Sequence, residues 1–228
     1  MSEDQTQYKV KFSWMELLVI LIIIGMTVAL LLPARQGSGL SGPRLFCVNK
    51  KKQLCAALHS YHNEYHTFPP AYTTDAEGKP LHSWRVLVLP YLEQESLFRT
   101  IRLDEPWDSD YNRQFHAQMP DIFACPVVSL EKGETAYQVL TGTGTYFPGA
   151  ECRSLDDPTL DKQNTVLLVE SRYPVCWMAP VDLSVETFET DTTPILSHHA
   201  RHPNVVIADG TVADFSRFEI GAKHKYPE

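Results

Sequence analysis

The longest apolar stretch of the chain lies near its N-terminus. No residue from Leu17 to Pro33 is charged, and nearly all of these side chains are aliphatic. With the aromatic residues just before it, the span reaches about 20 residues, which as a helix covers the roughly 30 Å of a bilayer core. A secretory signal peptide is the alternative, but its apolar core is usually shorter. We therefore predict a retained transmembrane helix over 12–33, after a polar tail over 1–11.

A short segment over 34–44, rich in Gly and Ser, follows the apolar stretch and predicts a flexible linker. Regular structure is expected to resume near Leu45. Apolar and aromatic side chains then recur at helical spacing at Leu54, Ala57, Leu58, Tyr61 and Tyr65. This spacing predicts an amphipathic helix up to His66, ended by Pro69-Pro70.

The middle of the chain predicts two shorter helices. Pro90 divides an apolar segment from a predicted helix over Tyr91–Ile101. Ser109 or Asp110 could cap another helix that runs to Met119.

Strand signals dominate the C-terminal half. Ala136–Thr141 and Thr165–Glu170 are short and β-branched, with Gly or Pro nearby. At Asn204–Phe215 two apolar runs flank Asp209-Gly210, a pair suited to a two-residue type I′ turn. Because helices come first and strands second, the predicted fold class is α+β.

Composition limits the possible partners. The chain has 228 residues, of which 43% are hydrophobic, so it can bury a core, and its net charge is −8. Nucleic acid is not an expected partner, because phosphate binding favours a basic face.

Few residue patterns indicate catalysis or metal binding. The chain lacks the common nucleophile and phosphate-loop motifs, so no catalytic residue is predicted. Two histidine groups, at His59, His62 and His66 and at His198, His199 and His202, are interpreted as structural or solvent-facing, so no metal site is predicted. Three acids beside Trp107 in the segment 104–108 could hold calcium, and a solvated acidic turn is the alternative. No other cofactor is expected.

The chain resembles a known family at both ends. The segment from Phe12, with Glu16 five positions into the motif, is similar to the prepilin-type N-terminus of type IV pilins and type II secretion pseudopilins. The stretches Cys47–Pro70, Ser83–Gln94, Leu103–Ser109 and Cys125-Pro126 resemble a large bacterial family, domain of unknown function 1559. Its terminal signature, a His followed after nine residues by Asp-Gly, matches His199, Asp209 and Gly210.

This resemblance implies specific roles for the N-terminal residues. In pilins the prepilin peptidase exposes the aromatic residue, here Phe12, and Glu16 pairs with the new amine of a neighbouring subunit. The peptidase requires Gly where this chain has Lys11. The alternative is that Glu16 lies near the lipid headgroups and contacts water.

The resemblance also implies a location and a covalent link. It places the chain in the inner membrane as a single-pass protein, with a pilin-like domain over 45–228 outside the cytoplasm, in which a helix packs on an antiparallel sheet. The charge bias of the flanking segments favours the opposite orientation, and we follow the resemblance. A disulfide between Cys47 and Cys125 is the bridge that the family pattern implies. Reduced, buried thiols are the alternative, and the count of five cysteines is odd.

We therefore predict a membrane-anchored, non-catalytic structural or assembly protein of pilin or pseudopilin type. Its expected partners are membrane lipid and either like subunits or secretion and pilus machinery. The alternative is an anchored binding module for a glycan, a peptide or a metal ion.

Overall fold

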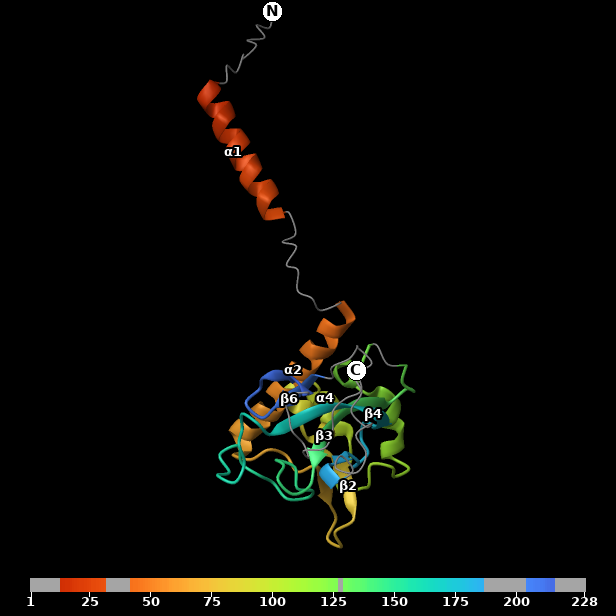
Figure 1. Ribbon diagram of the computed structural model, residues 1–228. Coiled ribbons are helices and arrows are strands. Elements are labelled where there is room, and N and C mark those ends of the chain that lie inside the picture. Colours follow the sequence, from red (N-terminus) through yellow and green to blue (C-terminus); the bar gives the residue numbers. More distant parts are fainter. Residues whose placement is uncertain (1–12, 32–41, 127–128, 187–203, 216–228) are drawn as a thin grey trace, which may run out of the picture. The chain divides into compact units, whose positions relative to one another are not determined.

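The computed structural model describes residues 13–31, 42–126, 129–186 and 204–215 (Figure 1). The chain divides into two compact units, Met1–Gly39 and Leu40–Glu228. Lys11, Phe12 and His199 lie outside the described residues, as does most of the predicted linker.

Helix α1 (Trp14–Leu31) forms the described part of the first unit. In its first turn the Ser13 backbone N–H donates to Glu16 Oε2 at 3.0 Å, which is one of the two hydrogen bonds of a capping box. The prediction of a transmembrane helix is wrong: no described helix is long and apolar enough to cross a membrane. The 18 residues of α1 span about 27 Å, which is shorter than a bilayer core.

Helix α2 (Gly42–Tyr65) is the longest element of the second unit. It begins before the predicted start at Leu45, with Pro43 in its first turn, where proline is tolerated. It ends where predicted, and His66 has the left-handed φ of 62°. The helix buries one face, formed by Cys47, Lys51, Leu54, Cys55 and Leu58.

A small antiparallel hairpin follows α2. Its strands are β1 (Tyr72–Thr74) and β2 (Pro80–Ser83). The Asp75 side chain closes the turn by accepting the Lys79 backbone N–H at 2.7 Å. No pattern in the sequence predicted this hairpin.

The predicted helix over Tyr91–Ile101 is divided in the structure. After α3 (Trp84–Leu87) come a 3-10 turn, η1 (Leu89–Leu92), and the short helix α4 (Glu95–Thr100). Glu93 separates the last two with a left-handed φ of 59°, which no continuous helix contains.

Two further 3-10 turns precede the large sheet: η2 (Asn112–Gln118) and η3 (Asp121–Phe123). The predicted short helix corresponds to η2, and Ser109 Oγ accepts the Asn112 backbone N–H at 3.1 Å.

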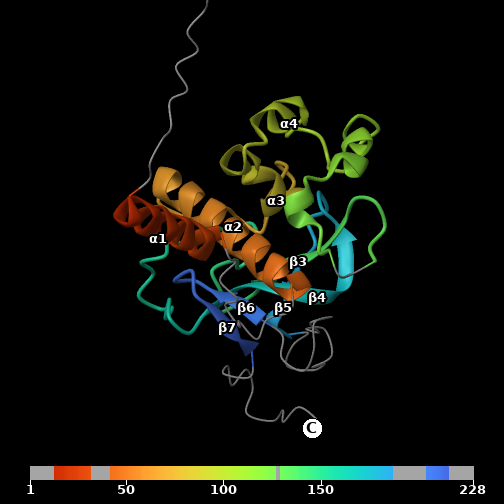
Figure 2. The same ribbon diagram turned by 90° about the horizontal axis from the view of Figure 1, so that it is seen from above.

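The main sheet has five strands in the order β5-β3-β4-β6-β7. They are β3 (Glu134–Thr141), β4 (Val166–Cys176), β5 (Leu183–Ser184), β6 (Asn204–Ile207) and β7 (Val212–Asp214). All pairings are antiparallel except that of β3 with β5. Figures 1 and 2 show α2 lying along this sheet, and it contacts β4 and β6. The α+β class agrees with the sequence prediction, but the predicted antiparallel sheet is mixed, because β5 pairs parallel to β3.

The turn between β6 and β7 is wider than predicted. Ile207 N–H donates to Thr211 O at 2.9 Å, and Gly210 N–H donates to Ile207 O at 2.9 Å. Three residues therefore form the loop, with Gly210 at φ 89°, as in a type I turn followed by a left-handed residue. Asp209 Oδ1 accepts the Thr211 N–H at 2.8 Å and fixes the turn.

Candidate functional site

A pair of buried thiols joins α2 to the segment after η3. Cys47 lies on the buried face of α2, and Cys125 follows η3 two residues after its end. Their Sγ atoms are 3.0 Å apart, within hydrogen-bonding contact. The structure therefore brings together the two cysteines for which the resemblance implies a disulfide, and the bond itself stays a prediction.

The thiol pair lies against a buried ion pair. The Cys125 thiol donates to Glu170 Oε1, on β4, at 3.1 Å. The other oxygen of Glu170 is 3.6 Å from Lys51 Nζ. Lys51 also donates to Asn204 O, on β6, at 2.7 Å. This cluster ties α2 to two strands of the sheet at one buried point.

The cluster lowers the pKa of the Cys47 thiol. The hydrogen bond with Cys125 lowers the pKa of Cys47. Burial and the Glu170 carboxylate oppose this effect, and the Lys51 ammonium adds to it. Burial lowers the pKa of Lys51, while the Glu170 carboxylate opposes that effect. A thiolate beside a second thiol is the species that enters thiol–disulfide exchange.

The same residues offer donor atoms to a metal ion. One ligand atom from each of Cys47, Cys125 and Glu170 lies within 4.8 Å of the others. Two sulfurs and a carboxylate would suit a soft or borderline cation. However, the Lys51 ammonium is already paired with Glu170 and would repel such a cation, so disulfide chemistry fits the cluster better.

The other cysteines are placed differently. Cys55 is buried on α2, where burial raises the pKa of its thiol to about 12. Cys152 is exposed and Cys176 is half-buried at the end of β4. Within the described residues none of these three forms a disulfide.

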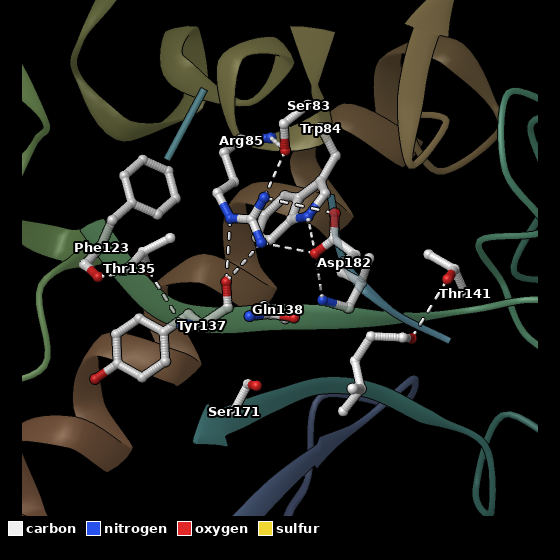
Figure 3. A network of polar contacts seen from close by, with 12 residues as sticks. Ser83, Trp84, Arg85, Phe123, Thr135, Tyr137, Gln138, Thr141, Ser171 and Asp182 are labelled. Atoms are coloured by element: carbon white, nitrogen blue, oxygen red, sulfur yellow. Dashed lines mark hydrogen bonds and ion pairs between the residues drawn. The ribbon is translucent and has the colours of Figure 1, made fainter. Parts of the chain in front are cut away.

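A second buried polar cluster, which the sequence analysis missed, surrounds Arg85 (Figure 3). Arg85 Nη2 is 2.6 Å from Asp182 Oδ1, with both side chains at most 2% exposed. The guanidinium also donates to Tyr137 O, at 2.9 Å from Nη2, and to Ser83 Oγ, at 2.7 Å from Nη1. The pair therefore fixes α3 against β3 and the segment before β5.

Asp182 accepts two further hydrogen bonds. Trp84 Nε1 donates to Asp182 Oδ1 at 3.1 Å, and the Val139 backbone N–H donates to the same oxygen at 3.0 Å. Burial raises the pKa of Asp182 to about 6, against the opposing effect of the Arg85 guanidinium. Every observed partner of this carboxylate belongs to the core, which indicates a structural role.

The predicted N-terminal and signature residues are only partly described. The Glu16 carboxylate accepts the Ser13 backbone N–H at the start of α1. This contact is local and needs no neighbouring subunit. Asp209 and Gly210 form the β6–β7 turn, whose Asp209 N–H donates to Lys162 O at 3.0 Å. The signature pair thus holds the hairpin against the loop before β4.

The first histidine group does not converge on one point. His62 Nε2 accepts the Leu155 backbone N–H at 3.0 Å. His59 packs edge-on against Phe68, and burial lowers its pKa. His66 is exposed. These contacts fit the structural interpretation of this group.

In the acidic segment 104–108, the Glu105 carboxylate contacts protein groups. It accepts Arg102 Nη1 and Ser109 Oγ, each at 2.8 Å. Trp107 stacks on His116 with ring centroids 5.1 Å apart. The calcium site stays an untested alternative.

Comparison with known proteins gives one family. The family described as "Protein of unknown function (DUF1559)" matches residues 44–165, which is more than half of the chain. No curated protein and no solved structure matches. The matched residues include Cys47, Cys125 and Arg85.

Proposed function

This chain belongs to the DUF1559 family of proteins of unknown function, and we propose that it is a non-catalytic assembly subunit of pilin-like type. In this proposal the second unit is a folded module outside the cytoplasm. Helix α1 associates with the same helix in other copies.

The surface of α1 carries the proposal. Its side chains from Trp14 to Val28 are all exposed, and from Leu17 to Met26 they are apolar around the whole circumference of the helix. An apolar helix without a polar face is stable in water only when another surface covers it. Packing of identical helices provides such a surface on every side, which is the arrangement that the resemblance to pilins implies.

The buried clusters of the second unit support a structural role. The cluster at Cys47 and Cys125 and the ion pair of Arg85 and Asp182 link helices to strands inside the core. In an oxidising environment the contact between Cys47 and Cys125 would become a disulfide bond.

The test is the oligomeric state of the purified full chain in mild detergent, measured by sedimentation velocity. We expect wild-type oligomers that dissociate in the variant Ile22→Glu, because a carboxylate enters the helix–helix contact. Val181→Glu is the matched control, since Ile22 is 53% exposed and Val181, in the second unit, is 51% exposed. A monomeric wild type, or an Ile22→Glu variant that associates as the wild type does, would overturn the proposal.

A further inference from the structure

An aromatic groove lies beside the C-terminal end of α2. It has a volume of about 410 Å³. Its walls come from α2, from the α3–η1 segment and from α4. The lining residues are Tyr61, Glu64, Tyr65, Leu87, Pro90, Tyr91, Glu95 and Phe98.

The rings of the groove face different directions. Tyr61 and Tyr91 have centroids 5.9 Å apart and ring planes at 71°, so two aromatic walls meet nearly at a right angle. Tyr65 also lines the groove and packs against Tyr61, with centroids 4.4 Å apart and planes at 37°. Several ring faces around one small space are the arrangement that attracts an organic cation.

The charged residues that line the groove are all acidic. Its lining residues, all in the described part of the chain, include two acids and no Lys, Arg or His. Tyr91 Oη donates to Glu64 Oε2 at 2.7 Å, which holds this carboxylate at the rings. Glu95 is engaged by Arg99 at 2.8 Å on the exposed side of α4. Glu64 is therefore the carboxylate available to a cation.

Tyr61 and Tyr91 keep their phenol protons at neutral pH. Burial raises the pKa of Tyr61 to about 12, and burial together with the hydrogen bond to Glu64 raises that of Tyr91. The side chains of Tyr61 and Tyr91 are therefore neutral phenols.

We propose that this groove binds a small, free organic cation of the quaternary-ammonium class. Such a cation makes no hydrogen bonds and is attracted to ring faces and to a nearby carboxylate. A phosphocholine headgroup fits less well, because Glu64 and Glu95 would repel its phosphate. The site is independent of the assembly role of α1, so either proposal can fail alone.

The first test is a calorimetric titration of the full chain with choline. The comparison ligand is the uncharged alcohol in which carbon replaces the quaternary nitrogen of choline. We expect saturable choline binding at least about tenfold tighter than binding of the alcohol, because only the cation gains the electrostatic attraction to the rings. Vesicles of phosphatidylcholine form the third arm, and Tyr65→Leu is expected to leave any association with them unchanged, because the apolar surface of α1 can also contact lipid.

Matched variants separate the groove from the rest of the surface. Tyr65→Leu is expected to weaken choline binding about tenfold. Tyr173→Leu should leave it unchanged, since Tyr65 is 54% and Tyr173 is 53% exposed and only the former lines the groove. Glu64→Gln should weaken binding several-fold, and Glu77→Gln, an exposed acid in the β1–β2 turn, should not.

Four results would overturn the proposal. They are the absence of saturable choline binding, equal affinity for the uncharged alcohol, binding of vesicles without binding of free choline, and equal effects of Tyr65→Leu and Tyr173→Leu. Each variant is checked for folding by circular dichroism. The exposed positions of Tyr65 and Glu64 make unfolding an unexpected outcome.

Discussion

Removal of the Asp182 carboxylate tests whether the buried ion pair holds the second unit together. In Asp182→Ala, the Arg85 guanidinium stays buried without its counter-charge. Breaking one partner of a buried ion pair costs about 3–5 kcal/mol. Trp84 Nε1 and the Val139 N–H also lose their acceptor, each with a desolvation cost of about 1–3 kcal/mol when no water replaces it. Because such costs are not additive, we expect a loss of about 4–6 kcal/mol at pH 7.

The assay is urea unfolding of the full chain, followed by tryptophan fluorescence. Trp84 and Trp177 are fully buried, so unfolding changes their emission. With a slope of about 2 kcal/mol per molar, the loss lowers the urea midpoint by about 2–3 M. The control is Glu95→Ala, which removes an exposed ion pair and should cost less than about 1 kcal/mol.

A double variant shows whether the buried charge is the cause. Arg85→Met with Asp182→Ala removes both charges, so it should be less destabilised than Asp182→Ala alone. The reasoning is refuted if Asp182→Ala costs no more than Glu95→Ala, or if the double variant loses the sum of the two single losses.

The remaining predictions concern titration, the thiols, the terminal turn and the N-terminus. Because burial raises the folded pKa of Asp182 to about 6, ionising this carboxyl costs more in the folded than in the unfolded state, so urea midpoints should fall as pH rises from about 4 through 6, and Asp182→Asn should remove this fall. Oxidised protein should contain a Cys47–Cys125 peptide pair under non-reducing mass spectrometry, and a pair with another cysteine would contradict this. Gly210→Ala should cost about 1–2 kcal/mol in urea unfolding through its φ of 89°, since no atom lies within 4 Å of the added methyl group. If prepilin processing occurs, the intact mass of the mature protein should correspond to a chain that begins at a methylated Phe12. A mass that includes residues 1–11 would contradict the processing that the resemblance to pilins implies.

Local signals predicted the parts of the fold that depend on local spacing. The helical spacing from Leu54 to Tyr65 corresponds to α2, and the β-branched runs correspond to β3, β4 and β6. The prolines at 69–70 follow α2 as expected. Errors arose where backbone conformation changes within a few residues. Glu93 adopts a left-handed conformation that its sequence context does not indicate, and this divides one predicted helix into two elements.

The candidate site was predictable only through the resemblance. The thiols of Cys47 and Cys125 are 78 positions apart, and no local pattern pairs them among five cysteines. Lys51 stands in a run of three lysines, which is typical of a solvated helix face, yet the side chain is buried against Glu170. Its burial follows from the rotation of α2 on the sheet, which is a tertiary property.

The Arg85–Asp182 pair shows why the spacing of hydrophobic residues does not predict buried polar clusters. Arg85 is the one charged residue in an apolar run, and hydrophobic patterning treats it as a break in the buried face. Its guanidinium is buried because Tyr137 O and Asp182, from two distant segments, converge on it beside the local acceptor Ser83 Oγ. A buried charge is stable only when its partners arrive together, so the pair forms only when α3, β3 and the segment before β5 have all been placed. The same dependence makes this pair a sensitive reporter of whether the whole second unit is folded.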